Sequence, residues 1–190
     1  MKVLLIPEDQ TLDQYILKPV MEALFAELRV TARISVLPEP RLRGSSQALD
    51  PNVIREIVQD NPMVDLFILI VDRDCDRERE RAEAKAEAIR KEHEVRLQTC
   101  LARQEVEVWM LALHSASLDE SLETIREDCD PKERWAIPLL ERLGTHGPGG
   151  GRKKAMRKLQ GSWRSLRDRC GELKELETQV STWQQGRKSA

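Results

Sequence analysis

Four apolar segments of this chain have the lengths and patterns of β-strands. Residues 2–7 and 66–71 are continuous apolar runs, which predict strands buried on both faces. Residues 30–36 alternate between apolar and polar side chains, as expected for a half-exposed strand. A short fourth strand is expected near residues 99–102.

Segments with helical periodicity separate these strands. Apolar residues recur every four positions from Leu12 to Leu28, which predicts a helix with a wide apolar face, kinked at Pro19. Further helices are expected from Pro51 to Asn61, over the highly charged residues 72–94, and over 104–114, whereas residues 38–50 are expected to form a loop. Alternation of strand and helix predicts an α/β fold, a mainly parallel sheet flanked by helices.

The last third of the chain is predicted to be helical, over residues 117–127, 131–143 and a long stretch after Gly151. We therefore divide the chain into an α/β core (1–114), a helical extension (115–150) and a basic helical tail (151–190). The glycine-rich run at 146–151 separates body from tail. It is interpreted either as a flexible linker or as a segment whose backbone can approach a phosphate closely.

Charge is distributed unevenly between these parts. The tail carries eleven Lys and Arg against four acidic residues, and residues 1–150 carry 20 basic against 29 acidic residues. A basic tail on an acidic body suggests contact with a polyanion, although a solvated basic helix explains it equally well. No apolar run approaches the roughly 20 residues of a membrane span, and no signal peptide is recognisable. We expect a cytoplasmic protein without membrane contact and with reduced, scattered cysteines that do not bind zinc.

Carboxylates follow two of the predicted buried strands. Glu8 comes directly after the first, and Asp72 and Asp74 come after the third. Because parallel strands end at one edge of a sheet, these side chains are expected to converge there and to favour a hard divalent cation such as Mg²⁺. The alternative is that Asp74 or Asp76 only caps the following helix.

The order and spacing of several motifs resemble the TOPRIM domain, and most closely the small stand-alone TOPRIM-like proteins, related to OLD-type nucleases, of bacterial phage defence. The similar elements are Glu8 with Thr11, Leu17 with Pro19, the D-x-D after the third strand, residues 107–111 (EVWML) and residues 162–164 (SWR). The resemblance covers residues 1–114 well and the tail loosely. Where the family has an acidic residue two places after Gln10 this chain has Leu12, and Asp13 follows one step later.

The resemblance implies a Rossmann-like, TOPRIM-type sheet and phosphoryl chemistry dependent on Mg²⁺ or Mn²⁺. Catalysis would fall to Glu8, Asp72 and Asp74. The implied metal ligands are Glu8, Asp72, Asp74, Asp76 and Glu107. The candidate nucleic-acid contacts are Arg152, Lys153, Lys154, Arg157 and Arg164.

These assignments predict a nuclease that hydrolyses phosphodiester bonds of DNA or RNA. Water is the expected nucleophile, because the one tyrosine, Tyr15, falls on the buried face of the first helix. The resemblance further implies an anti-phage effector that works with an ATPase partner. It is also compatible with a homo-oligomer. The alternative is a non-catalytic TOPRIM-like subunit that binds a partner protein or nucleic acid through the same edge.

Overall fold

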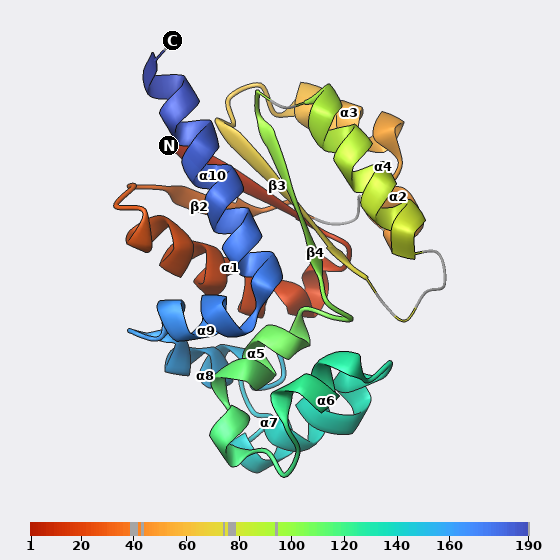
Figure 1. Cartoon of the computed structure of the whole chain (residues 1–190), viewed down its shortest axis with the longest axis vertical. Helices are drawn as coiled ribbons and strands as arrows, with labels where there is room; N and C mark the ends of the chain where they lie inside the picture. Colours follow the sequence, from red (N-terminus) through yellow and green to blue (C-terminus); the bar gives the residue numbers. More distant parts are fainter. Residues whose placement is uncertain (39–41, 43, 74, 76–78, 94, 190) are drawn as a thin grey trace.

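The structure is a computed structural model that describes residues 1–38, 42, 44–73, 75, 79–93 and 95–189. It is an α/β fold in which helices flank a sheet of four parallel strands (Figure 1). The strands are β1 (Lys2–Pro7), β2 (Arg33–Val36), β3 (Leu66–Asp72) and β4 (Leu97–Ala102). The helices of the first half are α1 (Gln10–Glu27), α2 (Ser45–Ala48), α3 (Pro51–Asp60) and α4 (Arg79–Glu92). Those of the second half are α5 (Glu107–Leu113), η1 (Ser115–Ser117), α6 (Leu122–Glu127), η2 (Lys132–Ala136), α7 (Ile137–Leu143), α8 (Arg152–Ala155), η3 (Met156–Leu159), α9 (Trp163–Arg169) and α10 (Gly171–Ser189).

The four predicted strands all form, in the order β2-β1-β3-β4. The central strands β1 and β3 are buried on both faces because nearly every residue in them is apolar. Strand β2 begins at Arg33 instead of residue 30, and β4 begins two residues before the predicted segment. Residues in β1 alternate between two hydrophobic clusters, with Val3 and Leu5 on one face and Leu4 and Ile6 on the other.

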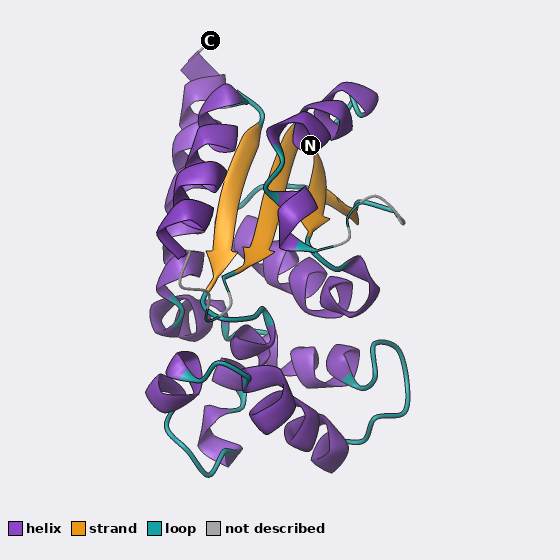
Figure 2. Cartoon of the chain, turned by 90° about the vertical axis from the view of Figure 1, so that its right-hand side faces the viewer, coloured by secondary structure: helices purple, strands orange, loops and turns teal. Residues whose placement is uncertain are grey.

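Each face of the sheet is covered by its own helices. Helices α3 and α4 contribute Ile54, Ile57 and Ile89 to one cluster, while α1, α5, α9 and α10 supply most of the other. Figure 2 shows the strands between these layers, with their arrowheads directed toward the helical second half of the chain. In the described part of the molecule, no helix combines the length and apolarity that a membrane crossing requires.

The second half is helical, as the sequence predicts, but its helices are short. The predicted helix 117–127 is reduced to α6, while 131–143 is helical from Lys132 through Leu143 as η2 and α7. The expected long tail helix is divided into α8, η3, α9 and α10. Leu166, Leu173 and Val180 of this tail join the same hydrophobic cluster as the sheet and α1.

Glycines 149 and 151 are packing positions, which favours a packed turn over a flexible linker at the end of this run. Gly149 is buried, and a Cβ there would lie 2.3 Å from Cδ2 of Tyr15. A Cβ on Gly151 would lie 2.7 Å from the carbonyl oxygen of Gly144. Both residues have positive φ angles, 68° and 90°. The run therefore turns the chain tightly against α1 and directs Arg152 into the interior.

Two cysteines are paired, contrary to the expectation of four reduced thiols. Cys75 and Cys129 form a disulfide with a Cα–Cα distance of 5.1 Å across 54 residues of sequence. Sequence spacing could not reveal this pair, because the fold alone brings the segment after β3 beside the segment after α6. Cys100 and Cys170 are free and buried.

Candidate functional site

The candidate site lies where the connections of the sheet change direction. The chain passes from β1 to β2 on one side of β1 and then crosses to β3 and β4 on the other side of β1. The strand order therefore reverses between β1 and β3, which is the switch point of the sheet. These strands are in parallel register, with Pro7 opposite Ile70. Glu8 follows β1 directly and Asp72 is the last residue of β3, which places both at the crevice where parallel sheets bind ligands.

Asp72 is the centre of a group of carboxylates at this edge. Its Oδ1 accepts a hydrogen bond from the Val106 N–H at 3.0 Å, which connects β3 to the start of α5. Burial raises the pKa of Asp72 well above its usual value, and the neighbouring carboxylates of Asp13, Glu107 and Glu8 raise it further. Glu8, Asp72 and Glu107, which the sequence proposed as ligands, are thus brought into electrostatic contact.

Asp13 belongs to the same group, although the sequence argument did not assign it to the site. Its side chain is directed inward from α1 and is 6% exposed. Burial raises its pKa to about 8, and Glu107 and Asp9 add to the shift. A sequence signal existed, since Asp13 precedes the buried Ile16, Leu17 and Val20 by three, four and seven residues and so falls on the apolar stripe of the helix.

Glu105 extends the group toward the second half of the chain. Burial raises its pKa to about 7, with Glu107 as the next contribution. Its Oε2 accepts the backbone N–H of Lys132 at 3.0 Å. Burial opposes the charge on the Lys132 side chain, but Glu107, Glu105 and Asp13 together raise its pKa. No sequence pattern near Lys132 predicts this role, because only tertiary packing brings η2 to the edge of the sheet.

Arg152 is the second cation of the site, and this corrects its predicted role as a nucleic-acid contact. Its Nη2 donates to Glu107 Oε1 at 2.6 Å, and the two side chains are 6% and 1% exposed. A guanidinium buried this deeply and paired with a carboxylate is not available to a phosphate in solution. Glu107, predicted as a metal ligand, is correspondingly held by Arg152.

Among the described residues, this edge holds two cations, Lys132 and Arg152, together with a group of five carboxylates. They are Glu8, Asp13, Asp72, Glu105 and Glu107. Asp13 and Glu107 are buried and the other three are partly exposed, and crowded oxygen donors of this kind fit the chemistry of a hard divalent cation. Among the described residues, however, no three His, Cys, Asp or Glu side chains are already arranged to hold a metal ion. The predicted ligands Asp74 and Asp76 lie outside the described residues.

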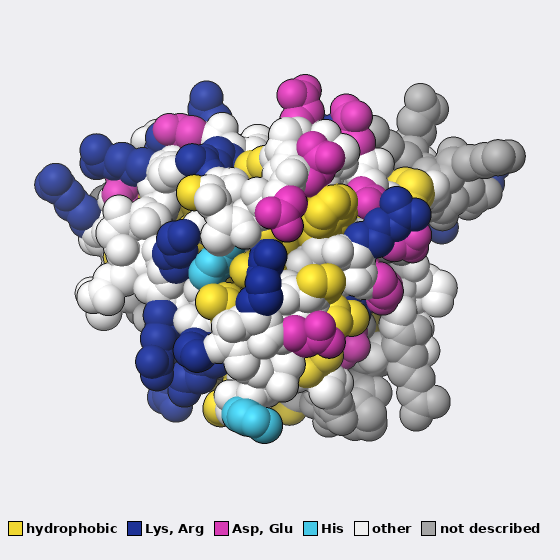
Figure 3. Space-filling view, turned by 90° about the horizontal axis from the view of Figure 1, so that it is seen from below, with side chains coloured by type: hydrophobic (Ala, Val, Ile, Leu, Met, Phe, Trp, Pro, Cys, Tyr) yellow, Lys and Arg dark blue, Asp and Glu magenta, His cyan; other side chains and the backbone are white. Residues whose placement is uncertain are grey.

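The remaining predicted nucleic-acid contacts are exposed side chains of the tail. Lys153 and Arg157 are exposed beside Lys154, whose Nζ donates to the carbonyl of Leu143. Arg164 pairs with Glu27 at 2.9 Å. Figure 3 views the end toward which the strands point and shows Lys and Arg gathered on one side of it, with Asp and Glu toward the other. Exposed cations on α8 and η3 thus follow directly after the buried Arg152.

Protein-family models, curated proteins and solved structures contain no match to this chain. The assignments above therefore depend on the geometry and chemistry of the residues themselves.

Proposed function

We propose that the protein is a divalent-metal-dependent phosphodiesterase of the TOPRIM type that hydrolyses nucleic acid. The observation that carries the proposal is the convergence of buried and half-buried carboxylates at the switch point of a parallel sheet, with exposed basic residues on the adjoining helices. Mg²⁺ or Mn²⁺, when bound, would supply charge neutralisation at the scissile phosphate. Glu8, Asp13 and Asp72 would hold the cation, and Asp74, two positions after Asp72 in the sequence, stays a predicted ligand.

The protein's own residues have distinct tasks in this proposal. Glu8 is the candidate for moving a proton to or from the attacking water. Arg152 positions Glu107, and Lys132 balances the charge of Glu105 and Glu107. Lys153 and Arg157 would contact the nucleic-acid backbone without reading its sequence. The resemblance described above adds an ATPase partner and a role in phage defence to the proposal.

A metal-titrated nicking assay on supercoiled DNA and on single-stranded RNA tests the activity. Asp72→Asn keeps an oxygen that can accept the Val106 N–H, and Glu8→Gln keeps the side-chain size. Each is expected to lower Mg²⁺- or Mn²⁺-dependent cleavage by roughly a hundredfold or more, with an unchanged circular dichroism spectrum. Asp65→Asn is the matched control, because Asp65 precedes the amino end of β3 and is far along the strand from the site.

A second candidate function is a non-catalytic subunit that binds its partner through this edge. The ion pair between Glu107 and Arg152 favours it, because it occupies one proposed ligand with a protein cation. This alternative predicts that the wild-type protein cleaves neither substrate with any divalent metal. Cleavage by the wild type that is lost in Asp72→Asn refutes it.

A further inference from the structure

The disulfide between Cys75 and Cys129 lies at the surface of the protein. Both of its cysteines are exposed, whereas the two free cysteines, Cys100 and Cys170, are buried. Burial raises the pKa of the Cys170 thiol to about 12 and that of Cys100 well above its usual value, which suppresses the thiolate form that thiol exchange requires. Exposed disulfides are the ones that thiols reduce most readily. The bridge is therefore the place in this chain where thiol exchange is expected.

The bridge joins two segments that both contribute to the carboxylate group of the candidate site. Asp72 precedes Cys75 by three residues, and Lys132 follows Cys129 by three. Because three residues span at most about 11 Å, the bridge lies close to both. Glu105, which accepts the Lys132 N–H at 3.0 Å, belongs to the segment that the bridge encloses. The bond therefore restrains the arrangement of the site from both sides.

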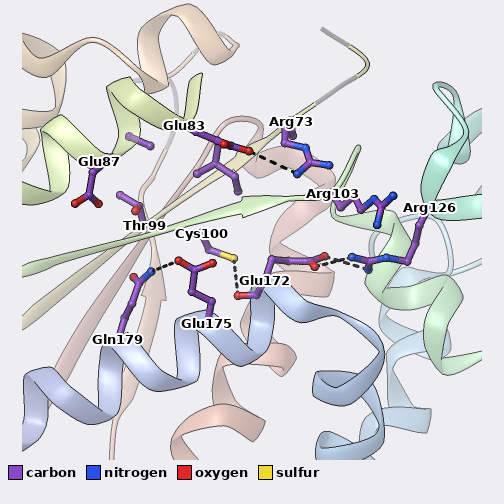
Figure 4. A pocket seen from close by; sticks show the side chains of 12 residues that line it. Arg73, Glu83, Glu87, Thr99, Cys100, Arg103, Arg126, Glu172, Glu175 and Gln179 are labelled. Carbon is purple, nitrogen blue, oxygen red and sulfur yellow. Dashed lines mark hydrogen bonds and ion pairs between the residues drawn. The ribbon is translucent and has the colours of Figure 1, made fainter. Parts of the chain in front are cut away.

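Other contacts hold the fold on either side of the bridge. Figure 4 shows Arg126 of α6 against Glu172 of α10. The guanidinium donates to both carboxylate oxygens, at 3.2 and 2.7 Å, and the two side chains are mostly buried. At the end of β3, the Arg73 N–H donates to the carbonyls of Ala102 and Gln104. Reduction of the bridge is therefore expected to leave α6 and β3 in place.

Helix η2 depends more directly on the bridge. Trp135 of η2 donates its Nε1–H to Asp128 at 3.0 Å, so the helix and the turn that carries Cys129 form one unit. A hydrogen bond from the Lys132 N–H to Glu105 connects this unit to the edge of the sheet. The bridge is a second, covalent connection to the same edge. Without it, the hydrogen bond to Glu105 is expected to open more often, because less of the chain holds its two partners together.

We propose that the Cys75–Cys129 bond is a thiol–disulfide exchange site through which a dithiol controls the candidate site. The oxidised form holds η2 against the carboxylate group, and the reduced form releases it. Where it concerns the binding of a divalent metal, this inference rests on the proposed function.

The chemical step is a two-electron exchange between the bridge and an external dithiol. A thiolate of the dithiol attacks one bridged sulfur, the S–S bond breaks, and the other cysteine leaves as a thiolate that takes up a proton. The second thiol of the reagent then attacks the mixed disulfide and frees the first cysteine. The protein gains two thiols, and the dithiol is oxidised to a disulfide. An external disulfide reverses the step.

Alkylation of the folded protein tests whether the bridge exchanges. The full chain is treated with excess dithiothreitol, freed of the reagent by gel filtration under argon, blocked with iodoacetamide and analysed by mass spectrometry. We expect Cys75 and Cys129 to be alkylated after reduction and protected before it, with an unchanged circular dichroism spectrum. Cys100 and Cys170 are internal controls, which should stay unmodified in both states. A bridge that is reduced only in urea, or whose reduction unfolds the chain, would overturn the proposal.

Amide exchange and metal titration test whether reduction reaches the site. In the reduced protein, exchange at the Lys132 N–H should accelerate at least tenfold, and the Kd for Mn²⁺ should rise about tenfold, because fewer molecules hold the binding arrangement. The Thr124 N–H, which donates to Ser121 Oγ inside the enclosed segment, is the control and should not change. Reoxidation should restore both values. A bridge with a merely structural role would lower the free energy of unfolding and move neither.

A double variant, Cys75→Ser with Cys129→Ser, fixes the reduced state. It should match the reduced wild type in both measurements and should not respond to dithiothreitol, which controls for effects of the reagent itself. If this variant does not fold, the comparison of reduced with reoxidised wild type decides the question.

The outcomes separate this inference from the proposed function. Exchange at Lys132 that is the same in both redox states overturns the inference, whatever the metal result. Equal Mn²⁺ affinity of the two states overturns control of the site. Absence of Mn²⁺ binding in both states refutes the proposed function instead, and exchange at Lys132 still decides whether the bridge holds η2 in place.

Discussion

Replacing Asp13 by asparagine is expected to change how the stability of the protein depends on pH. Asp13 lies inside the carboxylate group, and burial raises its pKa from 3.8 to about 8. In the unfolded chain the same group releases its proton near pH 4. Between these two values the folded state holds a proton that the unfolded state does not, so the free energy of unfolding falls as the pH rises.

The size of the effect follows from the shift. Each pKa unit corresponds to about 1.36 kcal/mol, so a shift of about four units amounts to a loss on the order of 5 kcal/mol once the pH exceeds 8. The asparagine side chain does not ionise in this pH range. Asp13→Asn should therefore be more stable than the wild type by about 1 to 2 kcal/mol at pH 5 and by about 5 kcal/mol at pH 9.

Urea unfolding followed by circular dichroism, at pH values from 5 to 9 and with divalent ions chelated, measures this difference. Asp65→Asn is the control, because the backbone N–H of Lys2 lowers the pKa of Asp65. That stabilisation is present above the unfolded pKa and is lost as the pH falls, so this variant should gain nothing at pH 9. Wild-type and Asp13→Asn curves that run parallel from pH 5 to 9 would refute the reasoning.

The same measurement also bears on metal binding. If the carboxylate group holds Mg²⁺, adding the ion at pH 8 should stabilise the wild type more than Asp13→Asn, because the ion replaces protons as the source of neutralisation. An equal response of the two proteins would count against Asp13 as a ligand.

Three further changes test the packing around the site. Arg152→Met leaves Glu107 buried without a partner and should cost about 3 to 5 kcal/mol in urea unfolding, most of which Glu107→Leu in the same chain should restore. Cys129→Ser opens a loop of 54 residues closed by Cys75 and should lower the free energy of unfolding by about 4 kcal/mol, whereas the reduced wild type should match this variant. Gly149→Ala places a methyl carbon 2.3 Å from an aromatic ring atom of α1 and should cost roughly 1 to 3 kcal/mol, seen as a lower Tm; an unchanged Tm would show that the turn is not tightly packed.

Local patterns in the sequence predicted the layers of the fold and part of the site. Continuous apolar runs identified β1 and β3, because a strand that is buried on both faces needs an apolar side chain at nearly every position. The four-residue repeat identified α1, because burial of one helix face needs apolar side chains about one turn apart. The position of Glu8 and Asp72 after buried strands was sufficient to predict that they lie at the same edge of the sheet, since parallel strands end at one edge. The predicted length of the tail helix was wrong, because the helix is interrupted at residues 160–162, where Gly161 has a φ of 75°, and again at Cys170.

The sequence by itself determined which segments are strands or helices and which carboxylates follow the two central strands, because both are properties of residues near one another in the chain. Only the tertiary structure decided that Asp13, Glu105 and Lys132 join those carboxylates, that Arg152 is enclosed with Glu107 and that Cys75 is bonded to Cys129. Each of these depends on contacts between segments that are distant in sequence, and their energies are set by burial, which a linear pattern does not specify.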